Sequence, residues 1–255
     1  MPQKSNPPLR PLKWYRKLAA RKGRLEADAF IVEGERAVRQ VIENYSGEIL
    51  EIVTTEGTTS PYPQYPNRTV TESQFHGISQ AQTPQGILAV VRPPWQVYTD
   101  NLPMDPGKRL LLLEDIQDPG NVGTLIRTAA AFDFSGVILT EKSADPFSPK
   151  CVQATAGSIL SLWLRRTGDY LEMVQALRKR GYYLLAADLN GKEDISELGK
   201  HKLLLLALGN EAGGLSEELL KISDYRLRLP TVREKAESLN VATCGAICMY
   251  LATRK

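Results

Sequence analysis

The stretch LLLLEDIQDPGNVGTLIR, residues 110–127, decides the fold class of this chain. It runs from four consecutive leucines, through a turn that contains Pro119 and Gly120, into a segment whose apolar residues have helical spacing. A continuous apolar run is typical of a strand that is buried on both faces, as strands are in parallel sheets. Because the alternation of such runs with helical segments continues to residue 229, the sequence predicts an α/β fold with a mainly parallel sheet.

The expected elements of this second half follow from the same patterns. The expected strands are 110–113, 137–140, 162–164, 183–187, 203–208 and 225–229. The expected helices are 121–132, 149–160, 169–180, 215–221 and an apolar final helix, 239–253. Ligands of such sheets bind beyond the carboxyl ends of the strands, so functional residues are expected in the loops that follow them.

The first half of the chain predicts a smaller α/β domain over residues 12–92. Its expected strands are 29–32, 49–54, 69–71 and 86–91, and its expected helices are 12–20, 35–45 and a short helix near residue 74. Residues 93–107 contain four prolines and are interpreted as a linker to a second domain, 108–255. Residues 1–11 are rich in proline and basic residues, which favours a flexible arm.

Composition restricts the class of protein. The chain is 42% hydrophobic and 24% charged, as is ordinary for globular proteins, and its apolar runs, such as 203–208, are far shorter than the ~18 residues of a membrane span. The first residues of the sequence lack the apolar segment that a secretory signal needs, so we expect no such signal. Cys151, Cys244 and Cys248 match no zinc motif and no disulfide framework. We therefore expect a cytoplasmic protein with no structural metal and no membrane partner.

Basic residues gather at the N-terminus. Residues 1–24 contain eight basic and no acidic residues, so the rest of the chain carries a net charge of −5 while the whole carries +3. Such a segment commonly binds nucleic-acid phosphates, although a solvated terminus has the same composition. Deletion of residues 1–24 should then weaken RNA binding and its salt dependence. The candidate RNA-binding residues are Lys13, Arg16, Lys17, Arg21, Lys22 and Arg24.

The first loop with candidate functional residues follows the strand 110–113. Asn121 is placed to cap the helix that begins there, and Arg127 lies six residues further on, among apolar neighbours. An arginine whose stem lies over the core is the alternative explanation for Arg127. The loop contains neither a Gly-x-Gly-x-x-Gly fingerprint nor the lysine of a P-loop, which argues against the common nucleotide-binding turns.

Two further loops stand at expected strand ends. Residues 209–216 include three glycines, which let the backbone approach a ligand closely, and the carboxylate of Glu211. Residues 229–240 end with Ser238 and Asn240, both of which also suit the cap of the final helix.

In order, spacing and placement after strands, the three loops resemble the three motifs of the SpoU (TrmH-like) family of the SPOUT superfamily. The first has the form Asn-x-Gly-x-x-x-Arg, the second Gly-x-Glu-x-x-Gly, and the third a proline followed by Glu-Ser-Leu-Asn-Val. The segment FIVEGE, residues 30–35, is similar to the substrate-binding domain that often precedes that family's catalytic domain. Thr231 and Arg233 stand where the family usually has Met and Gly, so the third motif is the least typical.

The resemblance implies an S-adenosyl-L-methionine-dependent methyltransferase that modifies the ribose 2′-hydroxyl of RNA. It implies a C-terminal trefoil knot, a homodimer, and a cofactor whose adenine is held by the backbone near Gly209, Leu229 and Leu239. Ribosomal RNA is favoured over tRNA because the front domain resembles those of ribosomal RNA methylases. There are two alternatives. The protein is a tRNA 2′-O-methyltransferase, or it is a non-catalytic RNA-binding or assembly protein that keeps the fold.

The resemblance also implies roles for individual residues. Arg127 would contact the target hydroxyl or its phosphate, in its own site or in the partner's. A guanidinium is very hard to deprotonate, so Arg127 is expected to orient and stabilise while a phosphate oxygen, Glu211 or water accepts the proton. Asn121, Ser238 and Asn240 would fix Arg127 and the ribose. No metal is required.

The final helix should be buried on most sides. No charged residue lies between Asn240 and Thr253, whereas a surface helix has a charged face. Cys244 and Cys248 are then expected to be small core residues rather than metal ligands or nucleophiles.

Overall fold

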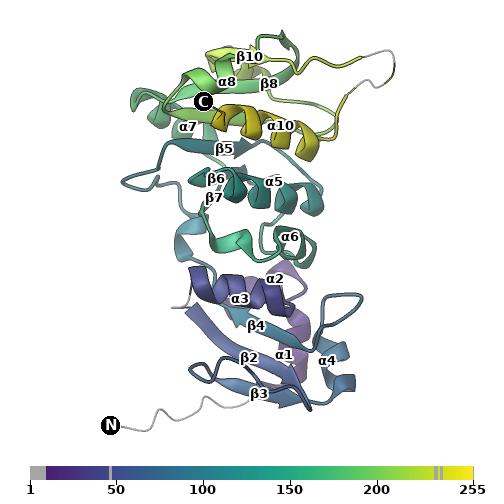
Figure 1. Ribbon diagram of the computed structural model, residues 1–255. Helices are drawn as coiled ribbons and strands as arrows, with labels where there is room; N and C mark the ends of the chain where they lie inside the picture. The colour runs from purple at the N-terminus through teal and green to yellow at the C-terminus, as the bar shows by residue number, and fades with distance from the viewer. Residues whose placement is uncertain (1–9, 46–47, 233–234, 236–237, 255) are drawn as a thin grey trace. The chain divides into compact units, whose positions relative to one another are not determined.

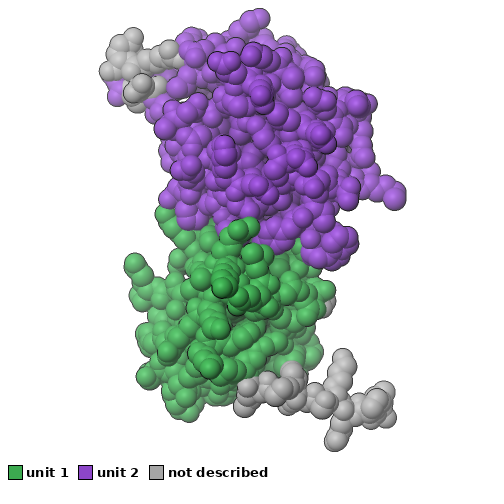
Figure 2. Space-filling view, turned by 180° about the vertical axis from the view of Figure 1, so that it is seen from behind, with its two compact units in different colours: residues 1–94, 147–161 green, residues 95–146, 162–255 purple. Residues whose placement is uncertain are grey.

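The computed structural model describes residues 10–45, 48–232, 235 and 238–254 (Figure 1). The arm expected at the N-terminus therefore lies mostly outside the described residues. The chain divides into two compact units, Met1–Pro94 with Phe147–Ser161, and Trp95–Pro146 with Leu162–Lys255 (Figure 2). Among the described helices, none is both long and apolar enough to span a membrane.

Unit 1 is built on a four-stranded sheet with the order β1-β4-β2-β3. β4 pairs antiparallel with β1 and β2, and β2 pairs parallel with β3. The strands are β1 (Phe30–Glu33), β2 (Ile49–Thr55), β3 (Asn67–Val70) and β4 (Ile87–Val91). The helices are α1 (Leu12–Lys17), α2 (Arg21–Ala27), α3 (Glu35–Asn44), α4 (Glu72–Ile78), α6 (Pro149–Thr155) and the 3-10 helix η3 (Ser158–Leu160).

The first helices of unit 1 belong to its core. Tyr15 and Leu18 are fully or almost fully buried in a cluster with Ile31 and Phe75. Helix α2 is absent from the sequence-based expectation because Gly23 lies inside it, and glycine disfavours helix. Gly23 is needed there, since a Cβ atom would lie 2.0 Å from the carbonyl oxygen of Lys17.

Unit 2 contains a six-stranded sheet with the order β10-β8-β9-β5-β6-β7, in which all pairs are parallel. The prediction of an α/β fold with a mainly parallel sheet is confirmed. The strands are β5 (Arg109–Leu113), β6 (Gly136–Thr140), β7 (Trp163–Thr167), β8 (Tyr183–Lys192), β9 (Leu204–Leu208) and β10 (Tyr225–Leu227). The helices are η2 (Trp95–Tyr98), a 3-10 helix, α5 (Pro119–Ala131), α7 (Tyr170–Lys179), α8 (Glu197–Lys200), α9 (Glu217–Ile222) and α10 (Val241–Thr253).

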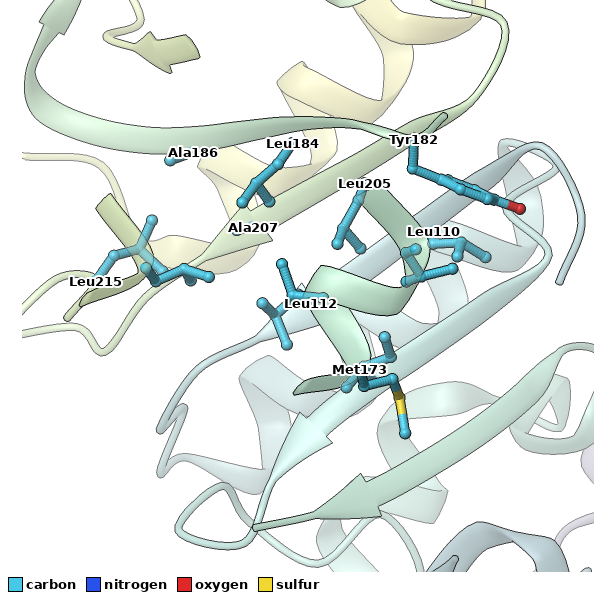
Figure 3. Close-up of a cluster of buried hydrophobic side chains, with 13 residues drawn as sticks. Leu110, Leu112, Met173, Tyr182, Leu184, Ala186, Leu205, Ala207 and Leu215 are labelled. Carbon is cyan, nitrogen blue, oxygen red and sulfur yellow. The ribbon is translucent and has the colours of Figure 1, made fainter. Parts of the chain in front are cut away.

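The leucine-rich strands of unit 2 place buried side chains on both faces of the sheet. Leu110 and Leu112 join Leu205 and Met173 in a buried cluster beneath α7 and α9 (Figure 3). The intervening leucines of β5 are also fully buried, and because successive side chains point to opposite faces, they lie on the other face. Helix α10 packs against α5. Both faces are therefore covered, as the apolar runs predicted.

Residues 95–107, interpreted above as a linker, lie within unit 2. Helix η2 contacts the edge strand β7. Asp100 accepts a hydrogen bond from the Thr167 hydroxyl at 2.5 Å, and the carbonyl of Asn101 accepts one from Arg165 Nε at 2.7 Å. The segment covers an edge of the sheet that would otherwise offer unpaired groups to another chain.

Helix α10 begins at Val241 and is only partly buried. Gly245, Cys248 and Met249 are buried against the unit, whereas Ile247 is 39% exposed and Tyr250 is 42% exposed. Only three of its thirteen residues are exposed, so α10 is covered on most sides as expected, and one uncharged face has no covering element among the described residues.

Candidate active site

A cavity of about 390 Å³ lies at the carboxyl ends of β9 and β10 and beside the second half of β8. Residues 187–190, 208–215, 227–229 and 231 line it, together with residues 238–241 and Cys244. Its volume falls in the range of ligand pockets, about 300–1,000 Å³. The position is the one at which parallel sheets bind their ligands.

The loop after β9 is folded on itself. The amide of Asn210 donates to the carbonyl of Gly214 at 3.0 Å, and the reverse bond is 2.9 Å. A Cβ atom on Gly209 would lie 2.2 Å from the carbonyl carbon of Gly214, so only glycine fits there. Asn210 Oδ1 accepts from the amides of Ala212 and Gly213, and its Nδ2 donates to the carbonyl of Asp115 at 2.8 Å. Asn210 therefore holds the second loop in shape and ties it to the first.

Glu114 also holds the second loop in place, through a hydrogen bond to Ser216. It is the residue after β5 and is only 4% exposed. Its carboxylate accepts a hydrogen bond from the amide of Ser216 at 2.8 Å and one from the Tyr170 hydroxyl at 2.5 Å. Burial, and then the hydrogen bond to Glu114, raise the pKa of Tyr170 to about 12. One buried carboxylate thus joins β5, α7 and the start of α9.

Asn121 does not cap its helix, contrary to the expectation from sequence. Asp118 is the cap, and its Oδ1 accepts from the amide of Asn121 at 3.0 Å, because Pro119 suits the first helical position. The side chain of Asn121 is therefore available to the other loops. Its Nδ2 donates to Glu211 Oε1 at 2.9 Å, and its Oδ1 accepts from Asn240 Nδ2 at 3.1 Å.

Asn240 also caps α10, since its Oδ1 accepts from the amides of Ala242 and Thr243. The bonds Asn240–Asn121–Glu211 consequently join one residue from each of the three loops. Ser238 and the positions expected near a cofactor line the same cavity: Gly209, Leu229 and Leu239. Thr231 lines it too, and Arg233 lies outside the described residues.

Arg127 lies apart from these residues. It is exposed on α5, does not line the cavity, and forms no hydrogen bond or ion pair with the described part of the chain. Six helical residues after Asn121 correspond to about 9 Å along the axis and roughly 240° around it, so the two side chains leave the helix in different directions.

The cysteines differ in environment. Cys248 is fully buried, as expected, whereas Cys244 is half-buried and lines the cavity. Within the described ranges, no group of three or more His, Cys, Asp or Glu side chains is placed to hold a metal ion.

Sequence reasoning missed four residues that shape the site: Glu114, Asp118, Tyr170 and Asn210. Two carried a signal. Asp118 directly precedes a proline, which is typical of a helix start, and Asn210 follows a strand inside a glycine-rich turn, where asparagine bonds to nearby backbone amides. Glu114 and Tyr170 are 56 residues apart, and nothing local indicates their pairing.

The candidate RNA-binding residues occupy α1 and α2. Four of them are exposed, and their side chains form no described hydrogen bond to a backbone carbonyl: Lys13, Lys17, Arg21 and Lys22. Arg16 is exposed, and its Nε donates to the carbonyl of Gly77 at 2.8 Å. Arg24 is only 7% exposed, and its guanidinium donates to the carbonyls of Leu18 and Ala19. Arg24 therefore serves the turn between the helices, and its side chain is not presented to a ligand.

Comparison with known proteins places this geometry in a family. The model of the SpoU rRNA Methylase family matches residues 108–250, and that of the MRM3-like substrate binding domain matches residues 10–89. The chain is 30% identical, over 94% of both chains, to the 23S rRNA (guanosine(2553)-2′-O)-methyltransferase RlmP of Bacillus subtilis.

Two solved structures are similar over nearly the whole chain. One is the SpoU methyltransferase AviRb from Streptomyces viridochromogenes in complex with AdoMet, with 26% identity, a TM-score of 0.81 and coverage of 95% of this chain and 96% of that one. The other is an AdoMet-bound rRNA methyltransferase from Sinorhizobium meliloti, with 29% identity, a TM-score of 0.80 and coverage of 94% and 93%. The family match covers more than half of the residues and confirms the resemblance seen in the motifs. This chain belongs to the SpoU rRNA methylase family.

Proposed function

We propose that this protein transfers a methyl group from S-adenosyl-L-methionine to the ribose 2′-hydroxyl of a nucleotide in RNA, and that its substrate is ribosomal RNA. One observation carries the proposal. Residues of the second and third loops line one cavity, and Asn121 of the first loop bonds to two of these lining residues, Glu211 and Asn240. The relative named above acts on 23S rRNA, and both similar structures hold AdoMet.

The cavity suits a nucleoside with a charged tail. Leu229 and Leu239 give it apolar wall, Ser238 and Glu211 give it polar groups, and Gly209 leaves backbone accessible. When bound, the cofactor supplies an electrophilic methyl group on a sulfonium centre.

The residues of the chain align the hydroxyl and handle its proton. Methyl transfer is an in-line displacement, which requires the ribose oxygen to be held opposite the leaving sulfur. Arg127 orients the target ribose through its phosphate and stabilises charge, while Ser238 and Asn240 fix the ribose. The proton passes to a phosphate oxygen, to Glu211 or to water. Asn121 holds Glu211 in place through the bond to Oε1.

The active form is a homodimer in the cytoplasm, and its last helix completes a trefoil knot. Unit 1 holds the RNA, and unit 2, which includes residues 95–107, performs the transfer. The position of Arg127 outside the cavity of its own chain supports a role in the partner's site. The uncharged exposed face of α10, with Ile247 and Tyr250, supports pairing of two copies.

The proposal is tested in two steps. Isothermal titration calorimetry with S-adenosyl-L-methionine should show saturable binding. Transfer of tritiated methyl groups should then label ribosomal RNA from cells that lack the protein, and mapping of ribose methylation should identify one nucleotide. Labelling of tRNA instead would make the protein a tRNA methyltransferase. Absence of cofactor binding would leave an RNA-binding or assembly protein that keeps the fold.

A further inference from the structure

Unit 1 contains a second cavity, of about 250 Å³, which methyl transfer does not use. It lies where β1 passes into α3, and the segment 80–85 and helix α6 close it. Its floor is apolar, with Ile31 and Val152 only 3% and 4% exposed. Its rim is polar and carries Arg36, Gln80, Thr83, Gln85 and Gln153.

Hydrogen bonds fix the shape of this cavity. The carboxylate of Glu33 accepts from the Ser79 hydroxyl at 2.5 Å and from the amide of Gln80 at 2.9 Å. Gly34 has φ +96°, and a Cβ atom there would lie 2.9 Å from Gln85 Oε1. The glycine therefore lets Gln85 reach the start of α3, where Oε1 accepts from the amide of Glu35 at 3.2 Å. The rim is held in place before any ligand arrives.

Two rim groups have no partner within the described part of the chain. Gln80 Nε2 is buried from solvent and donates to no described acceptor. Buried polar groups are normally hydrogen-bonded, so an unpartnered amide at a cavity indicates a missing acceptor. Arg36 is exposed and forms no described ion pair or hydrogen bond. Gln80, with its unpartnered amide, and the exposed Arg36 thus line the same cavity.

We propose that this cavity binds one unpaired nucleobase of the RNA, with Gln80 bonded to the base edge and Arg36 to the adjoining phosphate. A carboxamide offers donor and acceptor in one plane, as a base edge requires, and a guanidinium matches a phosphate. The apolar floor accepts the face of the base. The volume lies below that of pockets for larger ligands, about 300–1,000 Å³.

The base must be unpaired because sequence-specific recognition of RNA targets bases that are splayed out of helices. The inference rests on RNA as the substrate class of the proposed function. It concerns a different unit, however, and can therefore be tested without catalysis.

The first test uses Gln80→Leu in the full chain. Leucine is close in size and removes an amide that has no described partner, so the thermal unfolding midpoint should stay the same or rise. With a transcript of the 23S rRNA region that holds the nucleotide modified by the Bacillus subtilis relative, KM should rise about tenfold or more. The values of kcat and of the Kd for S-adenosyl-L-methionine should not change. Gln64→Leu, an exposed glutamine in a loop of unit 1, is the matched control and should change none of these values.

The second test does not depend on methyl transfer. The four ribonucleoside 5′-monophosphates are titrated, at millimolar concentration, into ¹⁵N-labelled full-length protein. At least one should shift the side-chain amide signal of Gln80 in a saturable way. If none does, or if Gln80→Leu leaves KM unchanged, the cavity is not a base-binding site. Failure of the wild type to bind S-adenosyl-L-methionine would contradict the methyltransferase proposal, while this titration would still decide the role of the cavity.

Discussion

Arg127 is exposed and has no described partner within its own unit. Its guanidinium has no described hydrogen bond or ion pair, although it stands on a helix whose start is bonded into the candidate site. An arginine that only covers the core usually extends its charge into solvent and carries no further role. The proposed contact with the substrate and the role of a surface arginine predict opposite effects of one substitution on the rate of methyl transfer.

Replacement of Arg127 by alanine should abolish most methyl transfer. Loss of one well-placed charged contact to the reacting groups costs about 10²–10³ in rate. Because the side chain holds no described element together, the unfolding free energy and the affinity for S-adenosyl-L-methionine should change little. Single-turnover transfer of tritiated methyl groups measures the rate. Arg180→Ala, an exposed arginine of unit 2 outside the cavity, is the control, and equal rates in both variants would leave Arg127 as a surface residue.

Single residues of the site were predictable where their neighbours in sequence determine their bonds. Asn240 caps a helix as its position before an apolar run indicates. Asn121 fits the same pattern, yet Asp118 takes the cap because a proline follows it directly. The pair Glu114–Tyr170 depends on which strand end faces which helix start. Such a contact is a property of the tertiary structure and has no signal in local sequence.

The Glu114–Tyr170 bond stabilises the junction of β5, α7 and the second loop. In Tyr170→Phe the buried carboxylate keeps only the amide of Ser216 as a described donor. Hydrogen bonds to charged groups contribute about 1.5–3 kcal/mol, so the unfolding free energy at pH 7 should fall by about that amount in urea denaturation. Tyr225→Phe is the matched control, because its buried hydroxyl has no described partner, and it should cost little.

The same bond makes stability depend on alkaline pH. The pKa of Tyr170 is about 12 in the folded chain and 10.0 as the reference for an unfolded one. Between these values the folded state binds more protons than the unfolded state, so the unfolding free energy falls as pH rises from about 10 to 12. Tyr170→Phe should lose less stability over this interval than the wild type. Equal slopes in the two proteins would show that the hydroxyl is not held as described.

Helices α1 and α2 combine core packing with surface charge. Tyr15 and Leu18 are buried in the core of unit 1, so deletion of residues 1–24 would unfold the unit and could not report on RNA binding. Charge must instead be removed at exposed positions only. The suitable set, changed together to glutamine, is Lys13, Lys17, Arg21 and Lys22.

This fourfold variant should bind ribosomal RNA more weakly and with a flatter salt dependence. Each lost phosphate contact removes about 0.9 from the slope of log K against log salt on a duplex, so the slope should fall by up to about 3 to 4. Filter binding at several salt concentrations measures it, and the melting temperature should not change. The control removes the same number of exposed charges from unit 2, at Lys179, Arg180, Lys202 and Lys221. A slope equal to that of the wild type would make α1 and α2 only a solvated surface.

The elements themselves followed from sequence most faithfully where apolar runs are continuous. Every strand expected in unit 2 is present, and the continuous apolar run is clearest in the buried central strands β5 and β9. Helix α2 was missed through Gly23, whose lack of a side chain serves a close approach rather than a turn. The segment 95–107 looked like a linker from its prolines, yet it pairs with β7 through Asp100 and Asn101. Composition indicates irregular backbone but does not show what that backbone contacts.

The two units cannot be separated by a single cut. The chain leaves unit 2 after residue 146 and returns at residue 162, so α6 belongs to unit 1 although it lies between two strands of unit 2. A fragment that ends at residue 94 would lack the helix that forms one wall of the second cavity. The division at residue 108 that the sequence predicted does not assign α6 to unit 1, because local sequence patterns indicate a helix but not the unit against which it packs. Experiments on either cavity therefore need the full chain.

At the scale of the whole assembly, α10 provides the test of the proposed homodimer. Ile247 is 39% exposed on a helix without charged residues, so a second copy would remove an apolar side chain from water there. Ile247→Asp would place an unpaired charge in that contact, and burial of such a charge costs several kcal/mol. The dimer should weaken at least about a hundredfold, as measured by light scattering over a range of concentrations.

The same variant should also lose methyl transfer if Arg127 serves the partner's cavity, since separated copies cannot supply it. Mixing Ile247→Asp with the wild type should not restore its activity, because the defect lies in association itself. Met104→Asp introduces the same charge at a residue that is 99% exposed elsewhere in unit 2, and it should remain dimeric and active. If Ile247→Asp stays dimeric, α10 is not the interface. If it becomes monomeric but keeps its turnover, each chain carries a complete site, and Arg127 must reach its own cavity by a movement of α5.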